Sequence, residues 1–264
     1  MIKPSDIPSY RSWLKGEHGV EVTAKTRNHF ESVAFKLQAD FESSPFWRTL
    51  LVSLGHYHDE YYAERNYPLF GALTAPDLLR KPFDSFFLKT FRKNILENEA
   101  YPNEPVGGWL LPTNWFNRIN DIVRTTLVVR YHDGVEYLLR EMVAIGADVK
   151  CDSRVSMEAR EEGYYAAHFY VVMPAEIPTQ DFDTQTIEAQ LEIQLTTQLQ
   201  DVIKKLLHKY YERRREGSVH TVELKWQWDY KSDEFVANYL GHVLHYVEGM
   251  IMEVRSRQEA ASKT

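Results

Sequence analysis

Apolar residues recur at spacings of three and four in the first third of the chain, which is the pattern of one face of an α-helix. We therefore predict a helix over 24–54 and another over 77–96. The stretch 56–71 between them is aromatic and polar without a clean period, so we expect a connecting loop with some helix there. The apolar positions that define the first helix are Phe30, Val33, Ala34, Leu37 and Phe41.

β-Branched and aromatic runs fill the middle of the chain, after Pro, Gly and Asn break the helical period over 101–115. An amphipathic stretch over 134–146, ended by a glycine, predicts a helix among them. In the last run apolar and polar residues alternate, which places Glu192 and Gln194 on the same face of a strand. The runs predict strands over 125–131, 163–174 and 191–197.

Helical periodicity returns after the last of these strands and dominates the C-terminal part of the chain. This order of elements predicts an α/β or α+β fold, with a central mixed β-sheet flanked by helices. We expect a single domain over 1–264, made of an N-terminal helical region (1–75), a core (77–215) and a C-terminal helical extension (218–264). The remaining predicted elements are a helix over 202–216, a strand over 222–228, a long helix over 233–257 and a polar tail from 255 that frays.

Composition and charge narrow the class of protein. The 264 residues are 44% hydrophobic, which is enough to bury a core, and the net charge of −7 argues against a protein that coats nucleic acid by bulk electrostatics. Cys151 is the single cysteine, so an internal disulfide and a multi-thiolate metal site are excluded. No stretch has the ~20 apolar residues of a membrane helix, and we expect a cytoplasmic protein.

Lys81, Ser85 and Lys89 follow one another at spacings of four, with Arg80 beside the first. On a helix this spacing puts two ammonium groups and a hydroxyl on one face, where they can bind a polyphosphate. Lysines four apart are also common on solvated helix surfaces, so the pattern alone leaves both interpretations open.

Two carboxylates occur at or on predicted strands. Asp121 opens the first strand, where a carboxylate can bind Mg²⁺ or can form a turn or helix cap. Glu192 lies within an otherwise apolar strand, where a charged side chain is costly without a metal or a charged partner. The two residues are therefore our candidates for a metal site.

A third group of polar residues precedes the second predicted strand. Gly163 lets the backbone turn, Tyr164 offers a ring for base stacking, and Arg160 can pair with phosphate. Tyr164 and His168 are four residues apart, so on a strand they share a face and can also be ordinary core residues.

Taken in order, these motifs resemble the synthetase domain of the RelA/SpoT family, over roughly 79–211. Four such pieces in the right order at sensible separations are hard to obtain by chance, and the chain resembles a small stand-alone alarmone synthetase, including the toxic branch that acts on tRNA. The matching pieces are Lys81 to Lys89, Asp121, Arg160 to His168, and Glu192 to Thr197 with His208, Lys209 and Tyr211 downstream.

The resemblance implies an ATP-dependent pyrophosphokinase, which transfers the β,γ-pyrophosphate of ATP to a ribose 3′-hydroxyl and releases AMP. It implies that Asp121 and Glu192 are catalytic and hold Mg²⁺, with Glu192 as general base. It also implies restraint by an antitoxin or by an opposing hydrolase. The residues it assigns to ATP are Arg80, Lys81, Ser85 and Lys89, and those it assigns to the acceptor are Arg160, Tyr164, His168 and Gln194.

The acceptor is left open because this chain departs from the family pattern around the substrates. Leu79, Thr126, Tyr165 and Thr196 stand where the family has arginine, and Arg124 stands where it has glycine. The acceptor is then GDP or GTP, giving (p)ppGpp, or an adenine nucleotide, or the 3′ end of tRNA in a toxin that inhibits translation. The basic cluster Arg213, Arg214 and Arg215 is a possible RNA contact.

Two other classes of function remain. His242, His245 and Glu248 are three residues apart on the last predicted helix, a spacing that can serve a metal-dependent hydrolase or regulator. Partly buried helical histidines are more often structural. The chain can also be a nucleotide-binding module without catalytic activity.

Overall fold

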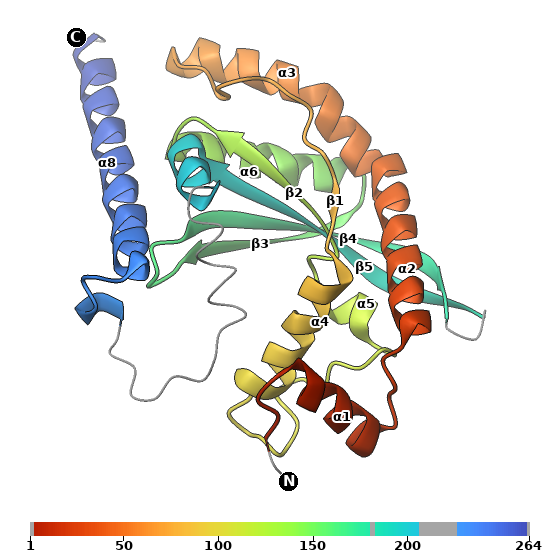
Figure 1. Cartoon of the computed structure of the whole chain (residues 1–264). Coiled ribbons are helices and arrows are strands. Elements are labelled where there is room, and N and C mark those ends of the chain that lie inside the picture. The colour runs from red at the N-terminus through yellow and green to blue at the C-terminus, as the bar shows by residue number, and fades with distance from the viewer. Residues whose placement is uncertain (1–2, 180–182, 206–225, 263–264) are drawn as a thin grey trace. The chain divides into compact units, whose positions relative to one another are not determined.

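A five-stranded sheet with strand order β1-β2-β5-β4-β3 organises the chain (Figure 1). In this computed structural model, residues 3–179, 183–205 and 226–262 are described. β1 runs antiparallel to β2, with Leu79 opposite Arg124 and Arg80 opposite Val123. The α+β fold with a mixed sheet is as predicted. The strands are β1 (Leu79–Arg80), β2 (Val123–Val129), β3 (Asp152–Ala159), β4 (Tyr165–Pro178) and β5 (Thr184–Thr197).

Helices occur before, between and after the strands. A helical segment over 198–205 follows β5 directly. The others are α1 (Ile7–His18), α2 (Ala24–Ser43), α3 (Pro45–Arg65), α4 (Phe83–Phe91), the π-helical turn η1 (Arg92–Leu96), α5 (Trp115–Arg118), α6 (His132–Asp148), the 3₁₀ turn η2 (Trp226–Trp228) and α8 (Asp233–Ser262).

The chain divides into two compact units, and β2, β4 and β5 each contribute residues to both. Each unit has its own core and its own candidate residues, so the two are described separately. Unit 1 comprises Met1–Trp47, Leu78–Thr125 and Tyr170–Glu192. Unit 2 comprises Arg48–Asp77, Thr126–Phe169 and Ile193–Thr264.

An aromatic core holds α4 in place within unit 1. The ring of Phe30 on α2 lies 4.2 Å from that of Phe86 on α4, measured between centroids. From α1, the buried Tyr10 packs on Phe87, and its hydroxyl donates to Thr90 Oγ1 at 3.2 Å. α4 therefore has a fixed position and orientation in its unit. This matters because α4 carries Lys89.

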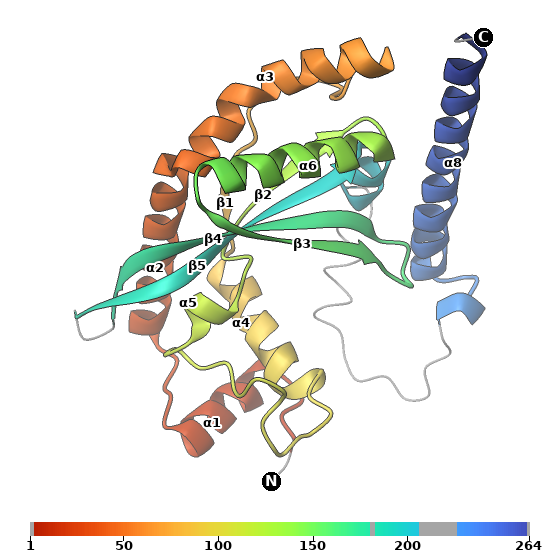
Figure 2. The same ribbon diagram turned by 180° about the vertical axis from the view of Figure 1, so that it is seen from behind.

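Helix α6 covers one face of the strands in unit 2, as Figure 2 shows. Its buried face includes Leu138, Met142 and Ile145. In the first turn, a Cβ on Gly134 would lie 3.0 Å from Leu69 and 3.2 Å from Val129. The glycine therefore allows the start of α6 to approach the end of β2 closely.

Several predicted boundaries in the first half of the chain are wrong. The stretch 56–71, predicted as a connecting loop with some helix, is helical as far as Arg65, because Pro45 starts a new helix that continues through it. The helix predicted over 77–96 begins only at Phe83, since Leu79 and Arg80 pair with β2 and Pro82 occupies the N-cap. Helix α1 lies within the predicted helical region 1–75 but was not predicted as a separate element, although Asp6 and Ser9 form a capping box that starts it.

Predictions in the second half fail for different reasons. β3 was not predicted because it lies at the sheet edge and is largely exposed, so it lacks an apolar run. In the strand predicted over 222–228, residues 226–228 form a 3₁₀ turn and the rest lies outside the described residues. The tail expected to fray from 255 is instead helical to Ser262. Arg255 explains this, because it is buried against Tyr67 and Asp133.

Candidate functional site

Asp121 is the centre of a buried charge cluster in unit 1. Lys81 Nζ donates to its Oδ2 at 2.7 Å, and Lys89 Nζ donates to its Oδ1 at 2.8 Å. Both Asp121 and Lys81 are buried. The cluster holds two cations and one anion, so it carries a net positive charge. Such a cluster is suited to a polyanionic ligand.

The sheet and α4 bring this cluster together. The Lys81 N–H donates to the Ile122 carbonyl at 2.9 Å, which continues the β1–β2 pairing and places Lys81 beside Asp121. Lys89 reaches the same carboxylate from α4. The prediction that Lys81, Ser85 and Lys89 share one helical face is wrong for Lys81, which precedes the helix. Ser85 lies on α4 and is exposed.

Burial and charge act in opposite directions on this cluster. Burial would raise the pKa of Asp121, but Lys89 and Lys81 together hold that pKa well below its usual range. Burial lowers the pKa of Lys81, an effect that Asp121 opposes and that the nearby charges of Lys89 and Arg124 reinforce. Asp121 is therefore an anion at neutral pH. The charged form of Lys81 depends on a negative partner such as Asp121.

Arg80, which we assigned to ATP together with Lys81, is anchored on α2. Its Nη1 donates to Gln38 Oε1 at 2.8 Å, and its guanidinium lies 5.1 Å from the centroid of the Phe35 ring. Leu79, at the position where the family has arginine, is exposed. The guanidinium of Arg80 is therefore directed to α2, and Leu79 supplies no charge at the preceding position.

Glu192 is buried in unit 1, on the strand β5 that neighbours β2 in the sheet. The Tyr170 hydroxyl on β4 lies 3.5 Å from Glu192 Oε1, which is at the outer limit of a hydrogen bond. Leu191 and Ile193 on either side of it are fully buried, as the alternating pattern predicts. Tyr170 was not singled out from the sequence, although it shares a strand face with His168 two residues earlier.

The residues assigned to the acceptor lie in unit 2, and three of them are in mutual contact. Tyr164 Oη lies 3.2 Å from His168 Nε2, and the Arg160 guanidinium lies 5.3 Å from the centroid of the Tyr164 ring. Glu158 pairs with Arg160 at 2.5 Å and lies 3.8 Å from His168. Glu158, which the sequence did not indicate, therefore offsets much of the positive charge of Arg160.

Gly163 fixes the position of the Tyr164 loop. Its φ of +73° is in the left-handed region, so the predicted turn is confirmed. A Cβ on Gly163 would lie 2.3 Å from the carbonyl oxygen of Asn238, and one on Gly241 would lie 2.3 Å from that of Gly163. The loop therefore packs backbone to backbone against α8.

Gln194 has a cationic partner that the sequence reasoning missed. Lys204, on the helical segment 198–205, donates from Nζ to Gln194 Oε1 at 2.8 Å. One helical turn after the strand is a natural position for such a contact. The basic cluster Arg213, Arg214 and Arg215, together with His208, Lys209 and Tyr211, lies outside the described residues.

Tyr165, at another position where the family has arginine, contacts α8. Its hydroxyl lies 2.8 Å from His242 Nδ1, and its ring stacks on His245 with centroids 3.6 Å apart and planes within 2°. His242 Nε2 lies 2.8 Å from the Glu161 carbonyl oxygen, so both of its ring nitrogens are engaged. Among the residues that the structure describes, no three His, Cys, Asp or Glu side chains are grouped to bind a metal. The metal-hydrolase alternative gains no support from these described residues, and His242 and His245 instead contact Tyr165.

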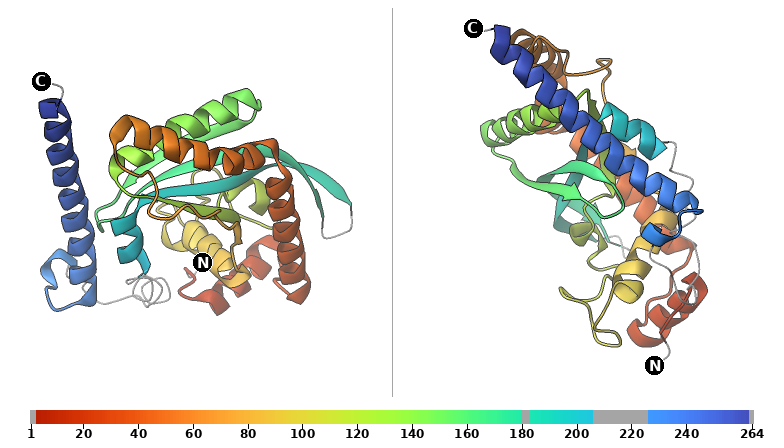
Figure 3. Two further views of the ribbon diagram at one scale, coloured as in Figure 1. Left: turned by 90° about the horizontal axis from the view of Figure 1, so that it is seen from above. Right: turned by 90° about the vertical axis from the view of Figure 1, so that its left-hand side faces the viewer.

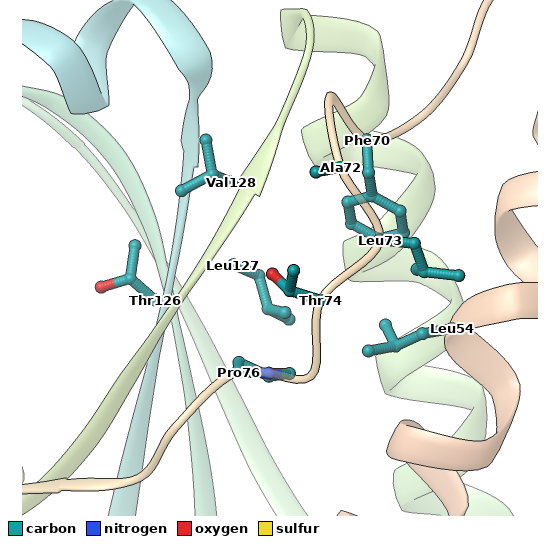
Figure 4. Close-up of a pocket in the computed structure, with 9 residues that line it drawn as sticks. All are labelled: Leu54, Phe70, Ala72, Leu73, Thr74, Pro76, Thr126, Leu127 and Val128. Carbon is teal, nitrogen blue, oxygen red and sulfur yellow. The ribbon is translucent and has the colours of Figure 1, made fainter.

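Neither of two cavities in unit 2 fits a nucleotide. One of about 100 Å³, shown in Figure 4, lies between α3, the 70–76 segment and β2, and its lining includes Thr126. It is lined by uncharged residues and is too small for a nucleotide. A second, of about 280 Å³, is lined in part by Tyr165, Thr196 and His245. Neither lining contains Lys or Arg, so neither is suited to phosphate.

The chain has the fold of the RelA/SpoT synthetase domain. Small alarmone synthetase 1 from Bacillus subtilis aligns with a TM-score of 0.52 and 13% identity, over 96% of this chain and 100% of that one. Its complex with the product pppGpp aligns with a TM-score of 0.50 and 16% identity, over 80% and 92% of the two chains. A GTP pyrophosphokinase family protein from Streptococcus pneumoniae gives 0.45 and 15%, over 96% and 97%.

At these identities the likeness establishes the fold, and the first two structures carry that conclusion. Neither a protein-family model nor a curated protein sequence matches the chain. Within the described residues, no helix combines the length and the apolar character needed to cross a membrane.

Proposed function

We propose that this protein is an ATP-dependent pyrophosphokinase that transfers the β,γ-pyrophosphate of ATP to a ribose 3′-hydroxyl. The observation that carries the proposal is the buried Asp121 carboxylate with Lys81 and Lys89 on its two oxygens. The fold supports it, since a structure with this fold is a small alarmone synthetase bound to its product pppGpp. The site residues are proposed from these observations together.

The donor side is Lys81, Lys89 and Asp121. Phosphate oxygens of ATP compete with the carboxylate for the two ammonium groups, which are the strongest donors in the cluster. Asp121 would then be free to hold Mg²⁺, and Glu192 would be a second oxygen ligand. Hard oxygen ligands of this kind fit Mg²⁺, which takes its other ligands from phosphates and water. When bound there, Mg²⁺ would neutralise part of the phosphate charge. Arg80 and Ser85 complete the proposed ATP contacts.

Glu192 is the proposed general base. It accepts the proton of the 3′-hydroxyl while that oxygen forms a bond to the β-phosphorus of ATP. The bond between the β-phosphorus and the α,β-bridging oxygen breaks, and AMP leaves with that oxygen. Lys81 and Lys89 stabilise the charge that develops on the phosphates, so positioning and electrostatics supply most of the rate enhancement.

On the acceptor side, Tyr164 provides a stacking surface, His168 orients its hydroxyl, and Gln194 is held by Lys204. Arg160 is already paired with Glu158, and Thr196 replaces a family arginine. Among the described residues assigned to the acceptor, the one cation, Arg160, is therefore offset by Glu158, which disfavours binding of a 5′-di- or triphosphate by these residues. This favours the 3′ end of tRNA, whose terminal nucleotide carries a single phosphodiester, over GDP or GTP. A guanine or adenine nucleotide is the competing acceptor.

The test is a labelling experiment. The protein is incubated with ATP labelled on the γ-phosphate and, separately, with GDP, GTP, unlabelled ATP or bulk tRNA, and the labelled species is identified. Label in tRNA supports both the reaction and the acceptor. Label in a guanine or adenine nucleotide keeps the reaction but overturns the acceptor. No label in any acceptor and no AMP release would overturn the proposed reaction and favour a nucleotide-binding module without catalytic activity.

A further inference from the structure

Helix α8 presents an unusual surface, because its apolar residues point outward. Six of them, spaced alternately by four and three residues, are each between 36% and 60% exposed. Figure 3, in its right-hand view, looks at this long helix where it lies over the rest of unit 2. We call the six residues the α8 seam: Val236, Leu240, Val243, Val247, Met250 and Val254.

The inner face of α8 carries the polar residues instead. Asn238, Glu248 and Arg255 are buried there. Glu248 accepts a hydrogen bond from Thr197 Oγ1 at 2.8 Å, and Arg255 lies 3.4 Å from Asp133. A surface helix of a monomer normally has the opposite arrangement, with its apolar stripe toward the core. The inner contacts fix α8 to unit 2, so the seam has no freedom to turn inward.

The spacing of the seam identifies the kind of partner. Alternating steps of four and three residues form the heptad pattern that keeps an apolar stripe facing a second helix along its length. From Val236 to Val254 the seam spans 19 positions, or roughly 27 Å of helix. Its partner is therefore another helix of similar length.

The residues that flank the seam indicate an identical partner. Charged residues at these positions normally favour pairing with a helix of opposite charge and oppose pairing of two identical helices. Here Glu253 is the one charged residue among six flanking positions, so two copies face little repulsion. The other five flanking residues are Ala237, Tyr239, Leu244, Tyr246 and Ile251.

The exposed area is also sufficient. With the exposed parts of Tyr239 and Tyr246, the seam offers roughly 750 Å² per copy, close to the ~800 Å² per partner of a stable interface. From these observations we propose that the protein forms a dimer in which the α8 seams of two copies pack against each other. The proposal is independent of the enzymatic activity.

The first experiment measures mass in solution for the full chain at micromolar concentration, by analytical ultracentrifugation. The wild type is expected to be a dimer. Val243→Lys puts a charge in the middle of the seam and is expected to raise the dissociation constant by roughly 100-fold. The matched control is Val52→Lys on α3, where the valine is 85% exposed and outside the seam, so it leaves the dimer unchanged.

The second experiment is cross-linking, which reports on the contact itself. In a Cys151→Ser background, Val243→Cys and Val247→Cys are combined, because this pair places cysteines opposite each other whether the helices run parallel or antiparallel. Oxidation is expected to give a covalent dimer, whereas Val52→Cys gives none.

A monomeric wild type would overturn the proposal, including the case in which residues 206–225 or a different protein cover the seam. A dimer that survives Val243→Lys and yields no cross-link would place the interface elsewhere and overturn it equally. Circular dichroism of each variant checks that the monomer is folded.

Discussion

Lys89 on α4 and Asp121 before β2 are 32 residues apart in the sequence, and their side chains meet at 2.8 Å. With Lys81 on the other carboxylate oxygen, this contact makes a single acidic residue the partner of two cations. Removing that acidic residue therefore has consequences for stability as well as for the proposed reaction.

Asp121→Asn is expected to reduce AMP release from ATP by orders of magnitude and to destabilise the fold by about 3 kcal/mol, because it leaves the buried Lys81 and the partly buried Lys89 without their counter-ion. Urea unfolding and an AMP assay measure the two effects. The control is Asp84→Asn, since Asp84 is an exposed partner of Arg27 on the same helix as Lys89. Equal losses in both variants would contradict the assignment of Asp121.

The ionisation of Glu248 should be visible in the pH dependence of the free energy of unfolding. Burial raises the pKa of Glu248 to about 7, against the opposing effect of the Thr197 hydrogen bond. A carboxyl group whose pKa is higher in the folded than in the unfolded state binds more protons when folded. It therefore lowers stability as the pH rises from about 4.5 through 7.

Glu248→Gln keeps an acceptor for Thr197 and cannot ionise. We expect it to remove this pH dependence. The change that it makes to the free energy of unfolding should be about 2 kcal/mol more stabilising at pH 8 than at pH 5. Glu253→Gln, on the exposed side of the same helix, should leave the profile unchanged. Denaturant melts across this pH range decide between the two results.

The close approach of Gly163 and Gly241 predicts that neither tolerates a methyl group. Gly163→Ala and Gly241→Ala should each cost about 3 kcal/mol, since the added Cβ would lie 2.3 Å from a backbone oxygen. Gly249→Ala on α8 has open space around it and should stabilise the helix by up to ~1 kcal/mol. Thermal unfolding of the three variants provides the comparison, and a well-tolerated Gly241→Ala would show that the loop is not held against α8.

Replacement of Tyr164 should affect the binding of the acceptor but not the binding of ATP. Tyr164→Leu removes the ring on which a base can stack and is expected to raise the KM for the acceptor about 10-fold or more, with the KM for ATP unchanged. Tyr164→Phe retains the ring and loses the hydroxyl contact to His168, so it should behave nearly as the wild type. A leucine variant with wild-type acceptor KM would assign Tyr164 to the core instead.

The sequence predicted best where periodicity and chemistry coincide. The residues 191–197 predicted as a strand form the second half of β5, and the turn at Gly163 is where the pattern placed it. The position of Lys81 was not predictable from spacing, because a two-residue strand that pairs with β2 is too short to leave a pattern. Glu158 and Lys204 were missed because each acts through a partner that the fold, and no local motif, brings near.

α8 shows a different limit of sequence reasoning. Its apolar stripe was recognisable, but periodicity alone does not say which side of a helix faces the protein. The buried side of α8 is formed by Asn238, Glu248 and Arg255. The orientation of the helix therefore depends on contacts with residues such as Thr197 and Asp133, which are far away in the sequence.

The burial of Arg255 has a practical consequence for where the chain can be shortened. Truncation after Val254, where the sequence turns polar, would remove the Arg255 guanidinium, which lies 3.8 Å from the centroid of the Tyr67 ring. It would also leave Asp133 without this cation. Limited proteolysis should accordingly spare the bonds around 255. The polar end of the chain therefore helps to hold α8 in place within unit 2.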